Sequence, residues 1–108
     1  MSYTSFFLIE LEHGKFFAGE SIDPWKTLEE HRDGISGVTW TQIHRPVLLR
    51  EIVSVALKKD LNEYVRQVML QYGVDNVRGG DWSETRLTDK DRQRLSKELP
   101  QQRGCVLF

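Results

Sequence analysis

The stretch that decides the fold is residues 6–19, which read FFLIELEHGKFFAG. Residues 3–11 are rich in aromatic and branched apolar side chains, and a second aromatic run covers residues 15–19. Both runs have the composition of β-strands. Glu12-His13-Gly14 between them is a turn signal. The sequence therefore predicts a β-hairpin.

One helix and one strand are predicted directly after this hairpin. Asp23 followed by Pro24 marks a helix start, because an aspartate can accept from the exposed N–H groups there and proline has no N–H to leave unpaired. This helix is expected to end at about Asp33, before Gly34. The apolar run 47–55 predicts a third strand that is central, or nearly so, in its sheet.

The second half of the chain predicts two further helices. Apolar residues from Leu61 to Tyr72 recur with helical spacing, and Gly73 suits the end of that helix. A charge-dense helix is expected from Thr88 to about Leu99. The predicted fold class is therefore α+β, with a small three-stranded, mainly antiparallel sheet flanked by helices in the order ββαβαα.

Length and composition limit the classes of function. A chain of 108 residues suits one core, so residues 1–99 are expected to form one domain and residues 100–108 a flexible tail. The net charge of -1 gives no overall positive field for nucleic acid, so such a contact would need a local patch. Glu10 and Glu12 interrupt the N-terminal apolar run, and Cys105 is the single cysteine. These features predict an intracellular protein without a signal peptide or disulfide.

Several short motifs occur in an informative order. They are Phe7-Leu8-Ile9, Phe16-Phe17-Ala18-Gly19, Leu28-Glu29-Glu30-His31, the run GISGVTWT at 34–41, His44-Arg45-Pro46, and the run YGVDNVRGG at 72–80. In this order the chain resembles the GIY-YIG nuclease superfamily, as a degenerate member of a branch with the YGVDNVRGG-type motif. The resemblance covers roughly residues 3–87 and implies a GIY-YIG-like fold.

The resemblance also implies a set of site residues. In the superfamily two tyrosines and an arginine surround a metal-bound water and the scissile phosphate, and a glutamate on a later helix holds a divalent cation. Phe7 and Phe17 stand at the tyrosine positions, Thr27 at the arginine position and His31 at a histidine position. Glu63 matches the metal position, which implies Mg²⁺ or Mn²⁺. Phenylalanine lacks the hydroxyl and threonine lacks the charge, so the usual mechanism cannot run as it does in the family.

Three hypotheses follow. The first is a catalytically impaired domain that acts as a nucleic-acid or protein interaction module. The second is a divergent metal-dependent DNA endonuclease rebuilt around Glu63. The third is a membrane-tethered adaptor, because Cys105-Val106-Leu107-Phe108 fits the C-a-a-X prenylation pattern. Candidate nucleic-acid contacts are the basic residues near the motifs, Lys15, Lys26, Arg32 and Arg78.

Each candidate also has an ordinary structural explanation. Glu63 fits the polar face of its helix, and a histidine such as His31 is favoured near any helix C-terminus. The three tryptophans suit either base stacking or core packing, and core packing is expected for at least one of them. His13 and His44 have no cysteine or second histidine at ligand spacing, so they are expected to be surface histidines.

Overall fold

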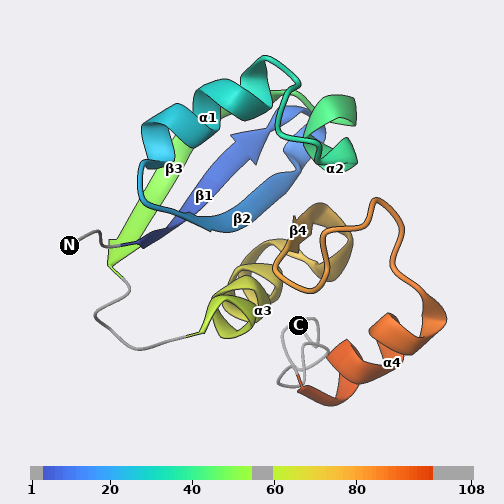
Figure 1. Ribbon diagram of the computed structural model, residues 1–108. Coiled ribbons are helices and arrows are strands. Elements are labelled where there is room, and N and C mark those ends of the chain that lie inside the picture. The colour runs from blue at the N-terminus through green and yellow to red at the C-terminus, as the bar shows by residue number, and fades with distance from the viewer. Residues whose placement is uncertain (1–3, 55–59, 99–108) are drawn as a thin grey trace.

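The computed structural model describes residues 4–54 and 60–98. It is an α+β fold in which helices flank a four-stranded sheet (Figure 1). The elements in chain order are β1 (Ser5–Leu11), η1 (Glu12–Gly14), β2 (Phe16–Ser21), α1 (Pro24–Arg32), α2 (Thr39–Ile43), β3 (Pro46–Ser54), α3 (Leu61–Tyr72), η3 (Val74–Asn76), β4 (Val77–Gly79) and α4 (Asp89–Glu98). No helix in the described ranges is both long enough and apolar enough to span a membrane.

The sheet is mixed, with the strand order β3-β1-β2-β4. β1 pairs antiparallel with β2 and with β3, whereas β4 runs parallel to β2. The α+β class and the hairpin are as predicted, but the prediction of three strands in the order ββαβαα is incomplete. It lacks α2, which has five residues, and β4, which has three. Elements this short carry too few residues to show a period.

The prediction of a central third strand is wrong, because β3 lies at the edge of the sheet. Three of its apolar side chains are correspondingly open to solvent: Val47 is 49% exposed, Leu48 40% and Ile52 46%. An apolar run usually indicates a strand buried on both faces. Here the run instead leaves apolar surface along one edge.

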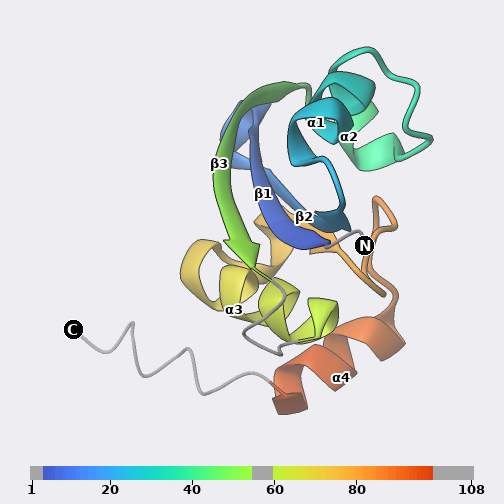
Figure 2. The same ribbon diagram turned by 60° about the vertical axis from the view of Figure 1, so that its left-hand side comes forward.

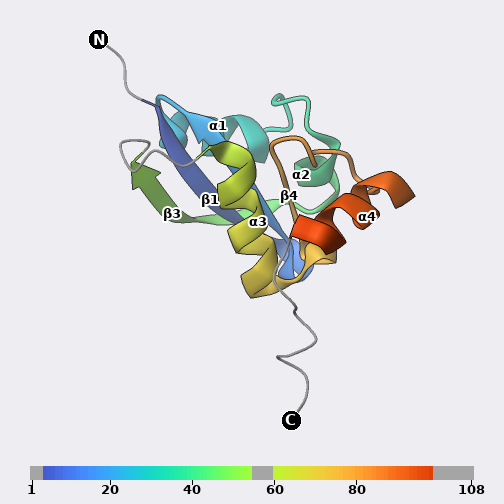
Figure 3. The same cartoon turned by 90° about the horizontal axis from the view of Figure 1, so that it is seen from below.

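Helices cover both faces of the sheet. Successive side chains of a strand point to opposite faces, so β1 and β2 contribute to two separate cores. On one face, the side chains of β1 and β2 pack with Leu28 of α1 and Trp40 of α2. On the other, they pack with α3 residues and with Leu95 of α4. Figures 2 and 3 show α1 and α2 on one side of the sheet, and α3 and α4 on the other.

The helix termini follow the local signals in the sequence. The Asp23 side chain accepts from the backbone N–H of Lys26 and caps α1. The N–H of Gly73, at φ 103°, donates to the carbonyl of Met69 at the end of α3. Of the tryptophans, Trp40 and Trp82 are buried, which confirms a core role, whereas Trp25 is 61% exposed.

Candidate functional site

Three of the family positions lie together on the face of the sheet that α1 covers. Phe7 on β1 and Phe17 on β2 have ring centroids 6.1 Å apart, because the hairpin places their strands side by side. His31, in the last turn of α1, lies with its ring centroid 4.9 Å from that of Phe17 and 6.5 Å from that of Phe7. All three side chains are buried. The place that the resemblance assigns to catalysis is therefore an aromatic cluster closed to solvent.

His31 is held in this cluster by a hydrogen bond. Its Nδ1 lies 2.7 Å from the hydroxyl oxygen of Thr41, and that hydroxyl donates to the carbonyl of Val38. Because the Thr41 hydroxyl donates its only hydrogen to Val38, its oxygen must accept the hydrogen bond from His31. Nδ1 of His31 therefore carries a hydrogen. Burial lowers the pKa of His31 from its ordinary value of 6.5, and Glu30 raises it by a smaller amount. The ring is therefore neutral in neutral solution.

Gly19 shows how tightly the cluster is filled. A Cβ atom at Gly19 would lie 2.5 Å from Cζ of Phe7, closer than real Cβ contacts allow. Cζ is the atom that would carry the hydroxyl if Phe7 were tyrosine. The ring tip thus points at the backbone of β2, and the cluster offers neither a hydroxyl nor an accessible surface for a phosphate.

Thr27 lies one turn before His31 on α1 and does not join the cluster's ring contacts. Its hydroxyl is 2.6 Å from that of Ser21, at the end of β2. Both line a shallow pocket of about 330 Å³ at the start of α1, together with Lys26 and two carboxylates, Asp23 and Glu30. Lys26 is thus the one basic side chain in this pocket, and the carboxylates offset its charge.

The structure does not bring Glu63 to this cluster. Glu63 lies in the first turn of α3, where its backbone N–H donates to the Asp60 side chain. α3 packs on the opposite face of the sheet from Phe7 and Phe17. Within residues 4–54 and 60–98 no group of three or more His, Cys, Asp or Glu side chains is placed to hold a metal ion. Glu63 and the two phenylalanines therefore do not converge on one site.

The four candidate nucleic-acid contacts do not gather on one surface. Lys26 and Arg32 are exposed on α1. Lys15 is partly buried, and its Nζ donates to Asn76 at 2.8 Å. Arg78 is buried on β4.

The contacts of Arg78 are those of a residue that stabilises the fold. Its guanidinium donates to four backbone carbonyls, those of Val74, Val77, Glu84 and Thr85. The same group lies over the Trp40 ring, 4.5 Å from its centroid. Burial lowers the pKa of Arg78 from its usual value, and Asp75 raises it by a smaller amount. Arg78 therefore ties the segment after β4 to the core.

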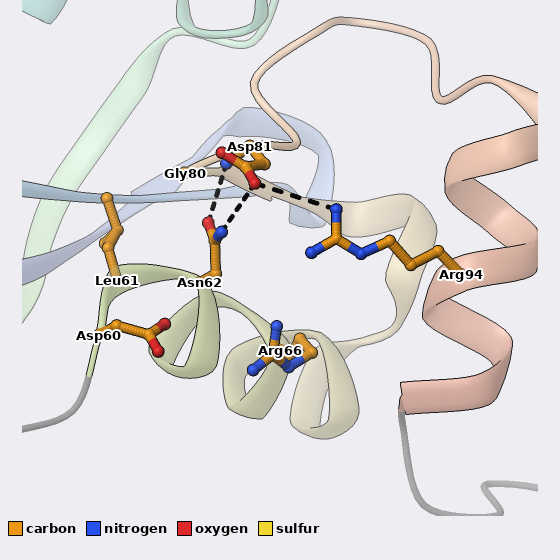
Figure 4. A pocket seen from close by; sticks show the side chains of 7 residues that line it. All are labelled: Asp60, Leu61, Asn62, Arg66, Gly80, Asp81 and Arg94. Atoms are coloured by element: carbon orange, nitrogen blue, oxygen red, sulfur yellow. Dashed lines mark hydrogen bonds and ion pairs between the residues drawn. The ribbon is translucent and has the colours of Figure 1, made fainter.

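A second pocket, of about 540 Å³, lies between α3, the turn after β4 and α4. Figure 4 shows Asn62 hydrogen-bonded to Asp81, whose carboxylate also forms an ion pair with Arg94. Arg66 and Arg94 both lie over the ring of the buried Trp82. The indole Nε1 of Trp82 has no hydrogen-bond partner among the described residues. The pocket mixes two guanidinium groups with two carboxylates, so it has no strong preference for an anion.

A pair of histidines is the feature that sequence reasoning missed. His13 in η1 and His44 after α2 have Nδ1 atoms 3.0 Å apart. Both carry solvent-accessible surface, as expected for surface histidines, but they contact each other across 31 residues of sequence. Ligand spacing within a motif gives no signal for such a pair.

Cys105, the candidate lipidation residue, lies outside the described residues.

Comparisons of the chain with protein-family models, with curated proteins and with solved structures found no match.

Proposed function

We propose that this chain is a GIY-YIG-like domain without nuclease activity that serves as a protein interaction module. The packing of Phe7, Phe17 and His31 supports the first part. The side chains that would position water and phosphate are replaced by a closed aromatic cluster, and Glu63 lies on the other face of the sheet. Removing one electrostatic group from such a site commonly costs about 100-fold or more in rate.

The observation that carries the second part is the edge strand β3. Within the described residues no strand pairs with its outer side. Leu48 and Ile52 on this strand are 40% and 46% exposed. A long apolar edge strand is a template for an added strand, and proteins usually protect such edges with charges or a covering segment.

The charged residues of β3 indicate what kind of segment would bind there. Arg50 is ion-paired with Glu10 at 2.8 Å, and Glu51 accepts a hydrogen bond from the Tyr64 hydroxyl at 2.6 Å. Both side chains therefore have a partner within the chain. Apart from Ser54, the other side chains of β3 are apolar, so we infer that the partner is an extended segment of another protein with apolar side chains at alternate positions.

A second copy of this chain fits the edge less well. When two identical antiparallel strands overlap fully, the central residue lies opposite itself. The centre of β3 is Arg50, so full overlap would place two guanidinium groups side by side. Like charges directly opposite are destabilising. Nucleic acid is also less favoured, because Lys15 and Arg78 are engaged internally and only two of the four candidate cations are exposed.

Selection of peptides from a displayed random library tests the interaction. Selected peptides should be extended and apolar, and methylation of alternate backbone nitrogens should abolish their binding. Leu48→Lys and Ile52→Lys should each weaken binding by about tenfold or more, because a lysine on an edge strand opposes strand addition. Leu70→Lys is the matched control, since Leu70 is a similarly exposed apolar residue, at 39%, on α3.

Binding that survives both β3 substitutions would contradict the assignment of this edge. Analytical ultracentrifugation of the unsubstituted chain and the same variants measures self-association. A dimer that is lost in the β3 variants would identify a second copy of the chain, instead of another protein, as the partner at this edge. Binding of fluorescent DNA with no peptide bound would favour a nucleic-acid module.

A cleavage assay tests the absence of nuclease activity. Labelled single-stranded, duplex and branched DNA are incubated with the full chain and Mg²⁺ or Mn²⁺, beside Glu63→Ala. We expect no cutting by either protein. Metal-dependent cutting that Glu63→Ala abolishes would establish a rebuilt endonuclease and overturn the proposal.

A further inference from the structure

His13 and His44 lie at two turns that the fold holds rigidly together. The backbone N–H of Glu12 donates to the carbonyl of Arg45 at 2.9 Å, and the N–H of Arg45 donates to the Glu12 carboxylate at 3.2 Å. These hydrogen bonds flank the histidine pair on both segments. The His44 ring also packs edge-on against Trp40, with centroids 4.6 Å apart. The two imidazoles therefore need little ordering before they bind a common ligand.

The separation of the two Nδ1 atoms matches that of two neighbouring ligands on one metal ion. With metal–nitrogen distances of about 2.0 Å, two ligands of a tetrahedral ion lie about 3.3 Å apart. Two adjacent ligands of a square-planar ion lie about 2.8 Å apart. The observed 3.0 Å falls between these values. The ring planes are inclined at 74° to each other.

We propose that His13 and His44 form a binding site for a transition-metal ion that favours imidazole, such as Zn²⁺, Ni²⁺ or Cu²⁺. In the ion-free pair, one Nδ1 carries a hydrogen and donates it to the other. When the ion binds, that ring carries its hydrogen on Nε2, so both Nδ1 lone pairs face the metal. Two neutral imidazoles release no net proton in this step.

The surroundings select among cations. Mg²⁺ and Ca²⁺ prefer several oxygen ligands, and the described residues offer no group of three or more ligating side chains here. Two imidazoles with water in the remaining positions suit Zn²⁺, Ni²⁺ and Cu²⁺.

Titration of Zn²⁺ and of Ni²⁺ into the full chain tests this site. Cys105→Ser is used as the background, because a thiolate would compete for the same ions. We expect one ion per chain and a shift of the Nδ1 resonances of His13 and His44, with those of His31 unchanged. Mg²⁺ should leave all three histidines unchanged.

Two conservative variants locate the ligands. His13→Asn keeps a residue that tolerates the φ of 67° at this position, and His44→Phe keeps a ring against Trp40. Each should weaken binding by about tenfold or more, since even a residue behind the ligands contributes that much. Unchanged affinity in both variants would overturn the proposal. The proposal would also be overturned if neither Zn²⁺ nor Ni²⁺ shifted the resonances of His13 and His44. This measurement uses the chain with both histidines intact, so it remains valid even if a variant fails to fold.

Discussion

The guanidinium of Arg78 lies 4.5 Å from the centroid of the Trp40 ring, in the interior of the protein. This contact joins β4, which carries Arg78, to α2, which carries Trp40. Within the described residues, the guanidinium donates to four backbone carbonyls and to no carboxylate. Removing the guanidinium would take away these four hydrogen bonds.

Arg78→Met should therefore destabilise the fold by about 3 kcal/mol, since buried carbonyls that lose a charged donor are costly. Arg78→Lys should recover only part of this, because an ammonium lacks the planar fork of donors. Urea unfolding measures both. Arg92→Met is the control: Arg92 is exposed and paired with Asp75 at 2.8 Å, so its loss should cost less than about 1 kcal/mol. Equal losses for Arg78 and Arg92 would contradict the structural role of Arg78.

Gly19→Ala should destabilise the aromatic cluster by about 1–3 kcal/mol, because the new methyl group would press on the ring of Phe7. Phe7→Leu shortens the side chain and should relieve that pressure. In a double-mutant cycle the two changes should therefore be favourably coupled. Additive losses would show that Gly19 is needed for another reason.

The stability of the protein should fall as the pH drops through about 6.5. The pKa of His31 is lowered in the folded state, so below pH 6.5 the unfolded chain binds a proton that the folded chain resists. His31→Gln can still donate to Thr41 but does not titrate, so part of the pH dependence should disappear. Urea unfolding at pH 7.5 and 5.5 measures it. His44→Phe removes the corresponding contribution of His44, and an unchanged pH dependence in His31→Gln would contradict the prediction.

Thr88→Ala should cost about 1 kcal/mol of stability by uncapping α4. The Thr88 hydroxyl accepts from the N–H of Asp91 at 3.0 Å, and the Asp91 carboxylate accepts from the N–H of Thr88 at 3.3 Å. Thr88→Ser keeps the hydroxyl and should retain most of the stability. Thermal unfolding of the two variants side by side provides the measurement, and similar losses in both would exclude the cap as the cause.

The sequence predicted the elements that have strong local signals. Asp23-Pro24 and Gly73 mark helix boundaries through backbone hydrogen bonds within a few residues, and these boundaries are confirmed. The hairpin also placed Phe7 beside Phe17, because a short turn fixes which strands are neighbours. Local signals say nothing about which strand lies at the edge of a sheet. The apolar composition of β3 therefore predicts burial, although the strand lies at the edge.

The candidate site was predictable only in part, for the same reason. The contact between His13 and His44 spans 31 residues, and two of the four carbonyls around Arg78, those of Glu84 and Thr85, come from an irregular segment. Neither arrangement leaves a pattern in sequence spacing. That Glu63 lies across the sheet from Phe7 follows from the face on which α3 packs, which helical periodicity alone does not fix.

The parallel pairing of β4 with β2 bears on the order in which the chain assembles. The adjacent hydrogen bond from Lys15 to Asn76 spans 61 residues, so closing this part of the sheet costs more loop entropy than forming the hairpin. The antiparallel strands β2, β1 and β3 are joined within residues 5–54 and can associate first. The apolar edge of β3 therefore exists before β4 is added. A newly made chain would present that edge to other proteins while the rest of its sheet is still incomplete.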